Sequence, residues 1–210
     1  MTEGSTAGER SKAFFEDLWS KGDHWELESS DFEHAKYSRQ IGLLDERRYR
    51  RAVEIGCGGG IFIRILADIS DHLLALDVAP SAIARSGKAV RGYANVELRT
   101  ANIMQTDLNV EGPWNLVVLT ETIYYLGWLY PFIDIAWFAY GLFTALEPGG
   151  RLLMANTQYG FEEPLMMPFI IQTYRDLFLN VGFHLEHEEL FKGTKRGVRT
   201  DVLVSLFCKS

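Results

Sequence analysis

Short apolar runs alternate along this chain with stretches in which apolar residues recur at helical spacing. The apolar runs predict five strands, at residues 51–55, 73–77, 96–99, 115–120 and 151–156. Between them, the helical spacing predicts helices at 61–69, 81–90 and 131–146. Continuous apolar strands that are separated by helices are typical of a parallel sheet covered on both faces.

The two ends of the chain follow other patterns. A frayed tail is expected at 1–10. The first helix follows, with one face formed by Phe14, Phe15, Leu18 and Trp19, and a second helix is expected at 31–44. After a helix at 168–181, strands at 184–191 and 200–209 predict a hairpin joined by the loop 192–198. We therefore predict an α/β fold with a seven-stranded sheet, mostly parallel, that ends in a C-terminal antiparallel hairpin. The expected parts of this single structural domain are an N-terminal helical lid at 1–45 and a main body at 46–210.

Composition and charge exclude several classes of protein. The chain has 210 residues, of which 47% are hydrophobic, so it can bury a full core. With 21 basic and 28 acidic residues its net charge is −7, which disfavours nucleic acid as a partner. Two cysteines exclude a disulfide scaffold and a cysteine-based zinc site, and we predict no metal. The N-terminus does not resemble a signal peptide, so we expect a cytoplasmic protein.

The segment 123–146 is long and apolar enough to need a membrane test. Pro131 and Asp134 lie near its middle, and an unpaired aspartate is costly in lipid. We therefore expect no membrane partner and interpret the segment as a buried loop and helix. Its aromatic residues are expected to form a hydrophobic wall near the ligand, and part of the helix surface is a candidate interface for a homodimer.

A glycine-rich loop follows the first strand, in the run Glu54-Ile-Gly56-Cys57-Gly58-Gly-Gly60. Glycines permit a tight turn and let the backbone approach a ligand closely. A dinucleotide site favours a small residue at position 61, where this chain has Ile61, so a pyrophosphate would fit poorly. Asp77 ends the second strand and can accept the two hydroxyls of a ribose. The alternatives are a purely structural turn and an aspartate that caps Ser81.

The run Glu54-x-Gly56-x-Gly58-x-Gly60 resembles motif I of S-adenosylmethionine-dependent methyltransferases, and Leu146-x-Pro-Gly-Gly150 resembles the turn before their fifth strand. The resemblance covers Arg51–Asn156 and implies the class I methyltransferase (Rossmann-like) fold for 46–210. It implies S-adenosylmethionine as cofactor and S-adenosylhomocysteine as product. In that family, an asparagine in the place of Asn102 meets the adenine amino group. The cofactor-binding residues implied by these motifs are Glu54, Gly56, Cys57, Gly58, Gly60, Asp77, Val78, Asn102, Ile103, Thr120 and Glu121.

Three further stretches look like the NodS-type nodulation N-methyltransferase family. They are the N-terminal block from Phe15 to Tyr37, the exit of the second strand at Ala75–Ala82, and the run Thr120-Glu-Thr-Ile-Tyr-Tyr-Leu126. This resemblance covers most of 14–153 and fades after Asn156. It implies that Lys36 and Tyr37 reach the carboxylate of the cofactor, with packing onto the sheet edge as the alternative. Trp19 and Trp25 are interpreted as lid residues that cover the cofactor, with amphipathic packing as the alternative for Trp19.

The predicted function is transfer of a methyl group to an amine of a small molecule, an amino sugar or an oligosaccharide. Glu121 is the first candidate for a catalytic residue that binds the acceptor or removes its proton, because it follows the fourth strand at the edge where open α/β sheets bind ligands. Tyr124 is expected to orient the acceptor or to shield the sulfonium. The alternatives are O-methylation of a natural product, a dinucleotide-dependent enzyme, and a non-catalytic protein that keeps the fold.

Overall fold

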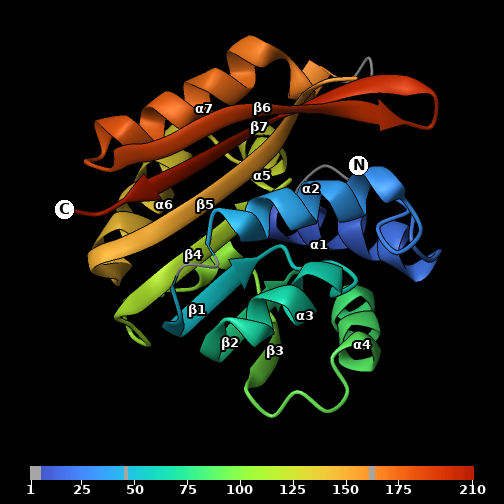
Figure 1. Ribbon diagram of the computed structural model, residues 1–210, viewed down its shortest axis with the longest axis horizontal. Coiled ribbons are helices and arrows are strands. Elements are labelled where there is room, and N and C mark those ends of the chain that lie inside the picture. The colour runs from blue at the N-terminus through green and yellow to red at the C-terminus, as the bar shows by residue number, and fades with distance from the viewer. Residues whose placement is uncertain (1–5, 45–46, 161–163) are drawn as a thin grey trace.

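The computed structural model describes residues 6–44, 47–160 and 164–210. Within them, seven strands form one sheet in the order β3-β2-β1-β4-β5-β7-β6 (Figure 1). The strands are β1 Tyr49–Ile55, β2 Ser70–Asp77, β3 Val96–Thr100, β4 Trp114–Thr120, β5 Leu146–Tyr159, β6 His184–Lys195 and β7 Val198–Cys208. The first five pair in parallel, and β7 runs antiparallel to both β5 and β6. The predicted parallel sheet with a C-terminal hairpin is therefore confirmed.

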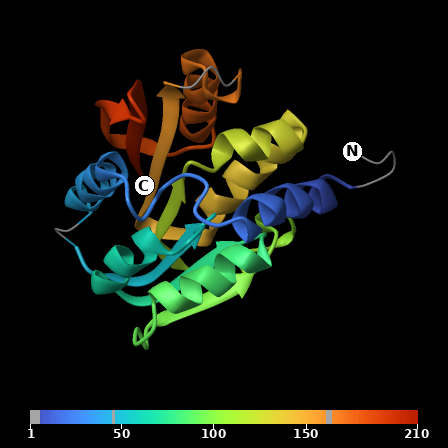
Figure 2. The ribbon, with the colours of Figure 1, turned by 90° about the vertical axis from the view of Figure 1, so that its right-hand side faces the viewer.

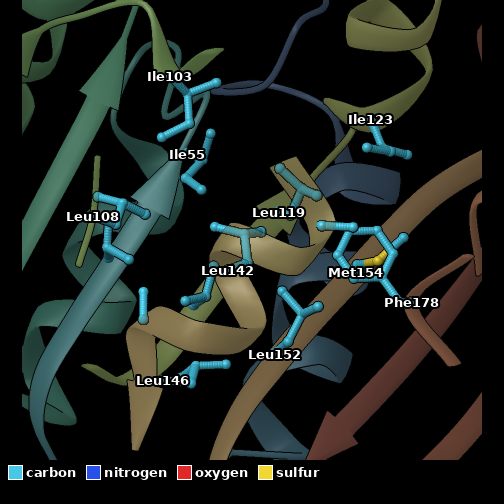
Figure 3. Packing of buried hydrophobic residues seen from close by; sticks show 14 of the residues in the cluster. Ile55, Ile103, Leu108, Leu119, Ile123, Leu142, Leu146, Leu152, Met154 and Phe178 are labelled. Carbon is cyan, nitrogen blue, oxygen red and sulfur yellow. The ribbon is translucent and has the colours of Figure 1, made fainter. Parts of the chain in front are cut away.

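Helices cover both faces of this sheet because its central strands are apolar on both sides. Leu116 and Val118 of β4 face one buried cluster, whereas Val117 and Leu119 face the other. The helices are α1 Ala7–Ser20, α2 Asp31–Gly42, α3 Ile61–Asp68, α4 Pro80–Ala89, α5 Ile123–Leu129, α6 Phe132–Ala145 and α7 Pro168–Asn180. Two short 3₁₀ helices, η1 Ile103–Gln105 and η2 Pro164–Met166, lie in the connections. Figure 3 shows the core on the side of α6 and α7, where side chains of β4 and β5 meet both helices.

The apolar segment 123–146 folds as two helices, α5 and α6, which are separated by Tyr130 and Pro131. No helix in the described parts of the chain is long and apolar enough to cross a membrane. The sequence indicated one helix after a loop, and it missed α5. Ile133 and Trp137 of α6 are 62% and 67% exposed. The homodimer interface expected on the surface of this helix stays a prediction.

Among the boundaries that differ from the predictions, three differ most. The first helix starts at Ala7 rather than after a frayed tail, because Thr6 and Glu9 form a reciprocal capping box. The hairpin turn is much tighter than the predicted loop, since Arg196 and Gly197 both adopt positive φ angles, as a two-residue turn requires. The strand predicted at 151–156 begins at Leu146, which pairs with Trp114 before a register shift. The predicted boundary at residue 45 falls on 45–46, outside the described residues.

Candidate active site

The carboxyl ends of β1, β2 and β4 open into a cavity of about 780 Å³. Figure 2 shows the blue helix α1 lying across this edge, against α4 on one side and α5 on the other. A volume of this size is typical of pockets for small molecules and cofactors. Of the predicted site residues, all but Gly60 line this one cavity. Gly60 lies at the N-terminus of α3, where it packs against Ser86.

A side chain of α1 packs directly on the glycine loop. Gly58 has a φ of +54°, and a Cβ added to it would lie 2.6 Å from the ring of Trp19. Glycine is therefore required there both by the backbone conformation and by the close approach of the indole. Trp19 in turn contacts Trp25, with 5.3 Å between their ring centroids. Glu16 of α1 accepts hydrogen bonds from the backbone N–H and the hydroxyl of Ser81, and these contacts hold α1 at the start of α4.

Two buried carboxyl groups lie beneath the loop. Asp77 accepts hydrogen bonds from the backbone N–H groups of Gly58 at 3.0 Å and Ala79 at 2.9 Å. Burial outweighs these bonds and raises the pKa of Asp77 to about 6. Oε2 of Glu54 is buried without a hydrogen-bond partner, and burial together with the charge of Asp77 raises its pKa to about 8. Such an arrangement favours a ligand that brings positive charge or hydrogen-bond donors.

Asn102, just past the end of β3, also lines the cavity. Its side-chain oxygen accepts a hydrogen bond from the N–H of Met104 at 3.1 Å, and its amide nitrogen donates to the hydroxyl of Tyr130 at 2.8 Å. Val78 and Ile103 add apolar lining to the same cavity. Asn102, which the resemblance assigned to the adenine, thus lines one cavity with the glycine loop and Asp77.

A chain of buried charges runs from the hairpin to the end of β4. Lys195, at the end of β6, lies 2.5 Å from Glu33 of α2, and Glu33 lies 2.6 Å from Lys36. Nζ of Lys36 then donates to Oε1 of Glu121 at 3.0 Å. The side chain of Lys36 is 1% exposed. Burial alone would lower its pKa, but the charges of Glu121 and Glu33 outweigh burial and raise the pKa above its usual value. Lys36 therefore pairs with two carboxylates of the protein, whereas the resemblance had assigned it to the cofactor.

Glu121 is held by several donors at once. Thr157 donates to it from its backbone N–H at 2.8 Å and from its hydroxyl at 2.9 Å, and the hydroxyl of Tyr124 donates at 3.1 Å. Glu121 also adopts a φ of +51°, an uncommon conformation for a residue with a side chain. Burial and the neighbouring Glu121 raise the pKa of Tyr124 well above its usual value. Tyr124 is therefore a hydrogen-bond donor at neutral pH and not a base.

The remaining predicted residues complete the wall of the cavity. Tyr37 is buried and stacks on Phe62 with 4.8 Å between ring centroids, and Thr120 donates to Gln40 at 3.2 Å. The thiol of Cys57 is buried, and burial raises its pKa, so it fits as a small side chain and not as a nucleophile.

Sequence reasoning missed three polar residues of the site, Thr157, Glu33 and Lys195. The position of Thr157 just past the predicted fifth strand was the only available signal. From the sequence alone, Glu33 lies near the start of the predicted helix 31–44 and Lys195 lies in the predicted polar loop 192–198. Their pairing needs the fold, because 162 residues separate them along the chain.

The fold and parts of the sequence match known proteins. The crystal structure of the N-methyltransferase NodS from Bradyrhizobium japonicum WM9 in complex with S-adenosyl-L-homocysteine superposes with a TM-score of 0.80 at 20% identity, over 95% of this chain and 98% of that one. Nodulation protein S from Rhizobium tropici is 28% identical over 137 residues, 65% of this chain and 56% of the relative. Phosphoethanolamine N-methyltransferase 1 from Zea mays is 32% identical over 71 residues, 34% of this chain and 14% of that protein.

These matches fix the fold and the family. The architecture is the class I methyltransferase fold that the resemblance implied. The chain spans about half the length of the curated relatives it matches. The family model for Nodulation protein S matches residues 8–129, which is more than half of the chain, so this protein belongs to the NodS family.

Proposed function

We propose that this protein is an S-adenosylmethionine-dependent methyltransferase that methylates an amine of a small molecule, the class that includes amino sugars and oligosaccharides. The observation that carries the proposal is the single cavity in which the glycine loop, Asp77 and Glu121 converge. The choice of nitrogen is supported by two relatives that are named N-methyltransferases, one of which was solved with S-adenosylhomocysteine.

The residues of the cavity fit this cofactor. The unpartnered Oε2 of Glu54 suits the ammonium of the amino-acid part, and Asp77 keeps acceptor capacity for ribose hydroxyls. Val78, Asn102 and Ile103 would hold the adenine. When bound, S-adenosylmethionine supplies a methyl group that is activated by the positive charge of its sulfonium.

The protein contributes position and a defined set of hydrogen bonds. Lys36 and Thr157 fix the Glu121 carboxylate at the end of β4, where it lines the cavity and its negative charge can orient the N–H groups of the acceptor amine. Fixing the amine in line with the methyl group removes much of the entropic barrier. Because Glu121 already pairs with the ammonium group of Lys36, it is better suited to orient the acceptor amine than to take a proton from it. An amine that arrives neutral needs no further base.

This arrangement also argues against O-methylation. A hydroxyl acceptor must lose its proton as it reacts, which requires a base in contact with it. Tyr124 keeps its own proton, and Glu121 is compensated by Lys36. Tyr124 and Glu121 thus favour a nucleophile that is active without deprotonation, and the remaining candidate base of the described cavity is the imidazole of His24.

The test combines cofactor binding with a panel of acceptors. Calorimetry should show binding of S-adenosylhomocysteine and not of NAD, and mass spectrometry should show the added methyl group on amines. Turnover with amines should rise with pH as the amine loses its proton. Methylation of hydroxyl acceptors alone would refute the choice of nitrogen. Failure to bind S-adenosylhomocysteine would instead favour a non-catalytic protein.

A further inference from the structure

Lys195 ends strand β6 at the tip of the C-terminal hairpin, yet its side chain is only 9% exposed. The two residues that follow, Arg196 and Gly197, adopt positive φ angles and turn the chain directly back into β7. A lysine is rarely buried unless its ammonium group has a partner. Here the ammonium group lies 2.5 Å from the carboxylate of Glu33, and both side chains line the cavity.

One face of β6 lies along helix α2 and places Lys195 at the start of that helix (Figure 1). Both carboxylate oxygens of Glu189 accept hydrogen bonds from Arg39 at 2.6 Å. The ring centroids of Phe191 and Phe32 lie 5.4 Å apart. Because side chains alternate between the two faces of a strand, positions 189, 191 and 195 share the face that meets α2. The position of Lys195 is therefore fixed by the packing of the whole strand.

The buried charges at this place form a balanced set of two ammonium groups and two carboxylates, Lys195, Glu33, Lys36 and Glu121. Lys36 lies between the two carboxylates, 2.6 Å from Glu33 and 3.0 Å from Glu121. Burial alone would raise the pKa of Glu33, but the charges of Lys36 and Lys195 lower it below its usual value. Without Lys195, the two carboxylates would share one ammonium group, and Lys36 would be drawn to Glu33, which is the nearer of the two.

We propose that Lys195 is a positioning residue for the methyl transfer, which neutralises Glu33 and so leaves Lys36 to hold the carboxylate at the end of β4 in the orientation that receives the acceptor amine. That carboxylate belongs to Glu121, which lines the cavity. The inference rests on the proposed function and adds a residue of the C-terminal hairpin to the groups that control it. Since misplacing a group by about 1 Å can lower a rate about 100-fold, a small displacement of Glu121 is measurable in kcat.

The experiment compares Lys195→Met with the charge-balanced double variant Glu33→Gln/Lys195→Met. The acceptor is glucosamine, or the amine of the acceptor panel that the wild type methylates fastest. We expect Lys195→Met to lower kcat at least about tenfold, while the acceptor KM and the Kd of S-adenosylhomocysteine change less than about threefold. The double variant removes one positive and one negative charge, so Lys36 is again available to Glu121 and most of the kcat should return.

Lys192→Met is the matched control, because Lys192 is exposed on the same strand and does not line the cavity. Its kcat should equal that of the wild type. Circular dichroism checks that each variant is folded, and titration with S-adenosylhomocysteine gives the concentration of competent sites. If Lys195→Met does not fold, the double variant decides the question, since a kcat near that of the wild type supports the inference and a large loss overturns it.

The other outcomes overturn the inference in distinguishable ways. A higher acceptor KM with an unchanged kcat would show that Lys195 binds the acceptor directly. A loss of affinity for S-adenosylhomocysteine would assign Lys195 to the cofactor. A double variant as impaired as Lys195→Met would show that the lysine is needed for packing and not for charge balance. If the wild type methylates no amine, the proposed function itself is refuted.

Discussion

Replacing Glu54 by glutamine removes a carboxyl group that is buried without a counter-charge. Glu54 is 4% exposed, and burial with the added charge of Asp77 raises its pKa from 4.5 to about 8. Because its pKa is higher in the folded chain than in the unfolded chain, the folded chain holds the proton more tightly. The resulting stability is present in full below about pH 4.5 and is lost as the pH rises through about 8.

The shift sets an upper bound on the effect. At about 1.4 kcal/mol per pKa unit, ionising Glu54 destabilises the fold by at most about 5 kcal/mol. That is a large part of the free energy of unfolding of an ordinary domain, which is about 5–15 kcal/mol. Glutamine has nearly the same shape and carries no charge, so Glu54→Gln should be clearly more stable than the wild type at pH 9 and similar to it at pH 5.

Urea unfolding of both proteins at several pH values between 5 and 9 checks this. The difference in free energy of unfolding should grow steadily with pH and level off above pH 8. Asp77, whose pKa is also raised, interacts with Glu54 and titrates with it as a pair, so the difference between the two proteins measures the charge of Glu54 together with its effect on Asp77. A difference that does not change across this range would refute the idea that Glu54 titrates in the folded protein. Binding of S-adenosylhomocysteine at pH 7 should also release protons from the wild type, and calorimetry in buffers of different ionisation enthalpy would detect this.

Three further substitutions test other parts of the site. Lys36→Met leaves the nearby carboxylate of Glu121 without its ion pair, so we expect a loss of about 3–5 kcal/mol of stability in urea unfolding and slower turnover of the acceptor; an unchanged midpoint would contradict the pairing. Asp77→Ala should weaken binding of S-adenosylhomocysteine more than tenfold, about 1.4 kcal/mol, and equal affinities by calorimetry would exclude the contact with the ribose. Gly58→Ala should destabilise the fold by more than the roughly 1–2 kcal/mol that a positive φ costs a residue with a side chain, because the new Cβ also meets the ring of Trp19. Gly197→Ala is the control that measures the backbone strain alone, because Gly197 has a positive φ and open space around it.

The pattern of apolar residues was sufficient to predict the sheet, because each central strand is buried on both faces and is therefore a continuous apolar run. It failed where the backbone is decided by single contacts. The capping box of Thr6 and Glu9 starts the first helix earlier than its apolar face does. Arg196 and Gly197 adopt positive φ angles and form a two-residue turn. Both hairpin strands therefore continue into the segment 192–198, whose polar composition is typical of a loop.

The candidate site divides in the same way. Residues that follow directly from strand ends, such as Asp77 and Glu121, could be placed from the sequence because parallel strands bring their carboxyl ends to one edge. The partner of Glu121 could not be predicted from the sequence. Lys36 lies 85 residues away along the chain, and its role depends on how α2 packs against the sheet. Charges on different elements find partners only through tertiary structure, so a spacing pattern contains no record of them.

A glycine loop between a strand and a helix suits two classes of cofactor, and the side chains around this one separate them. A dinucleotide brings a pyrophosphate, which needs open room and free N–H groups at the start of the helix. Here the ring of Trp19 covers Gly58, and the N–H of Gly58 already donates to Asp77. Burial raises the pKa values of Glu54 and Asp77, and the protein offers Glu54 no counter-charge of its own. An anionic pyrophosphate would increase this cost, whereas a cofactor with a sulfonium and an ammonium would relieve it.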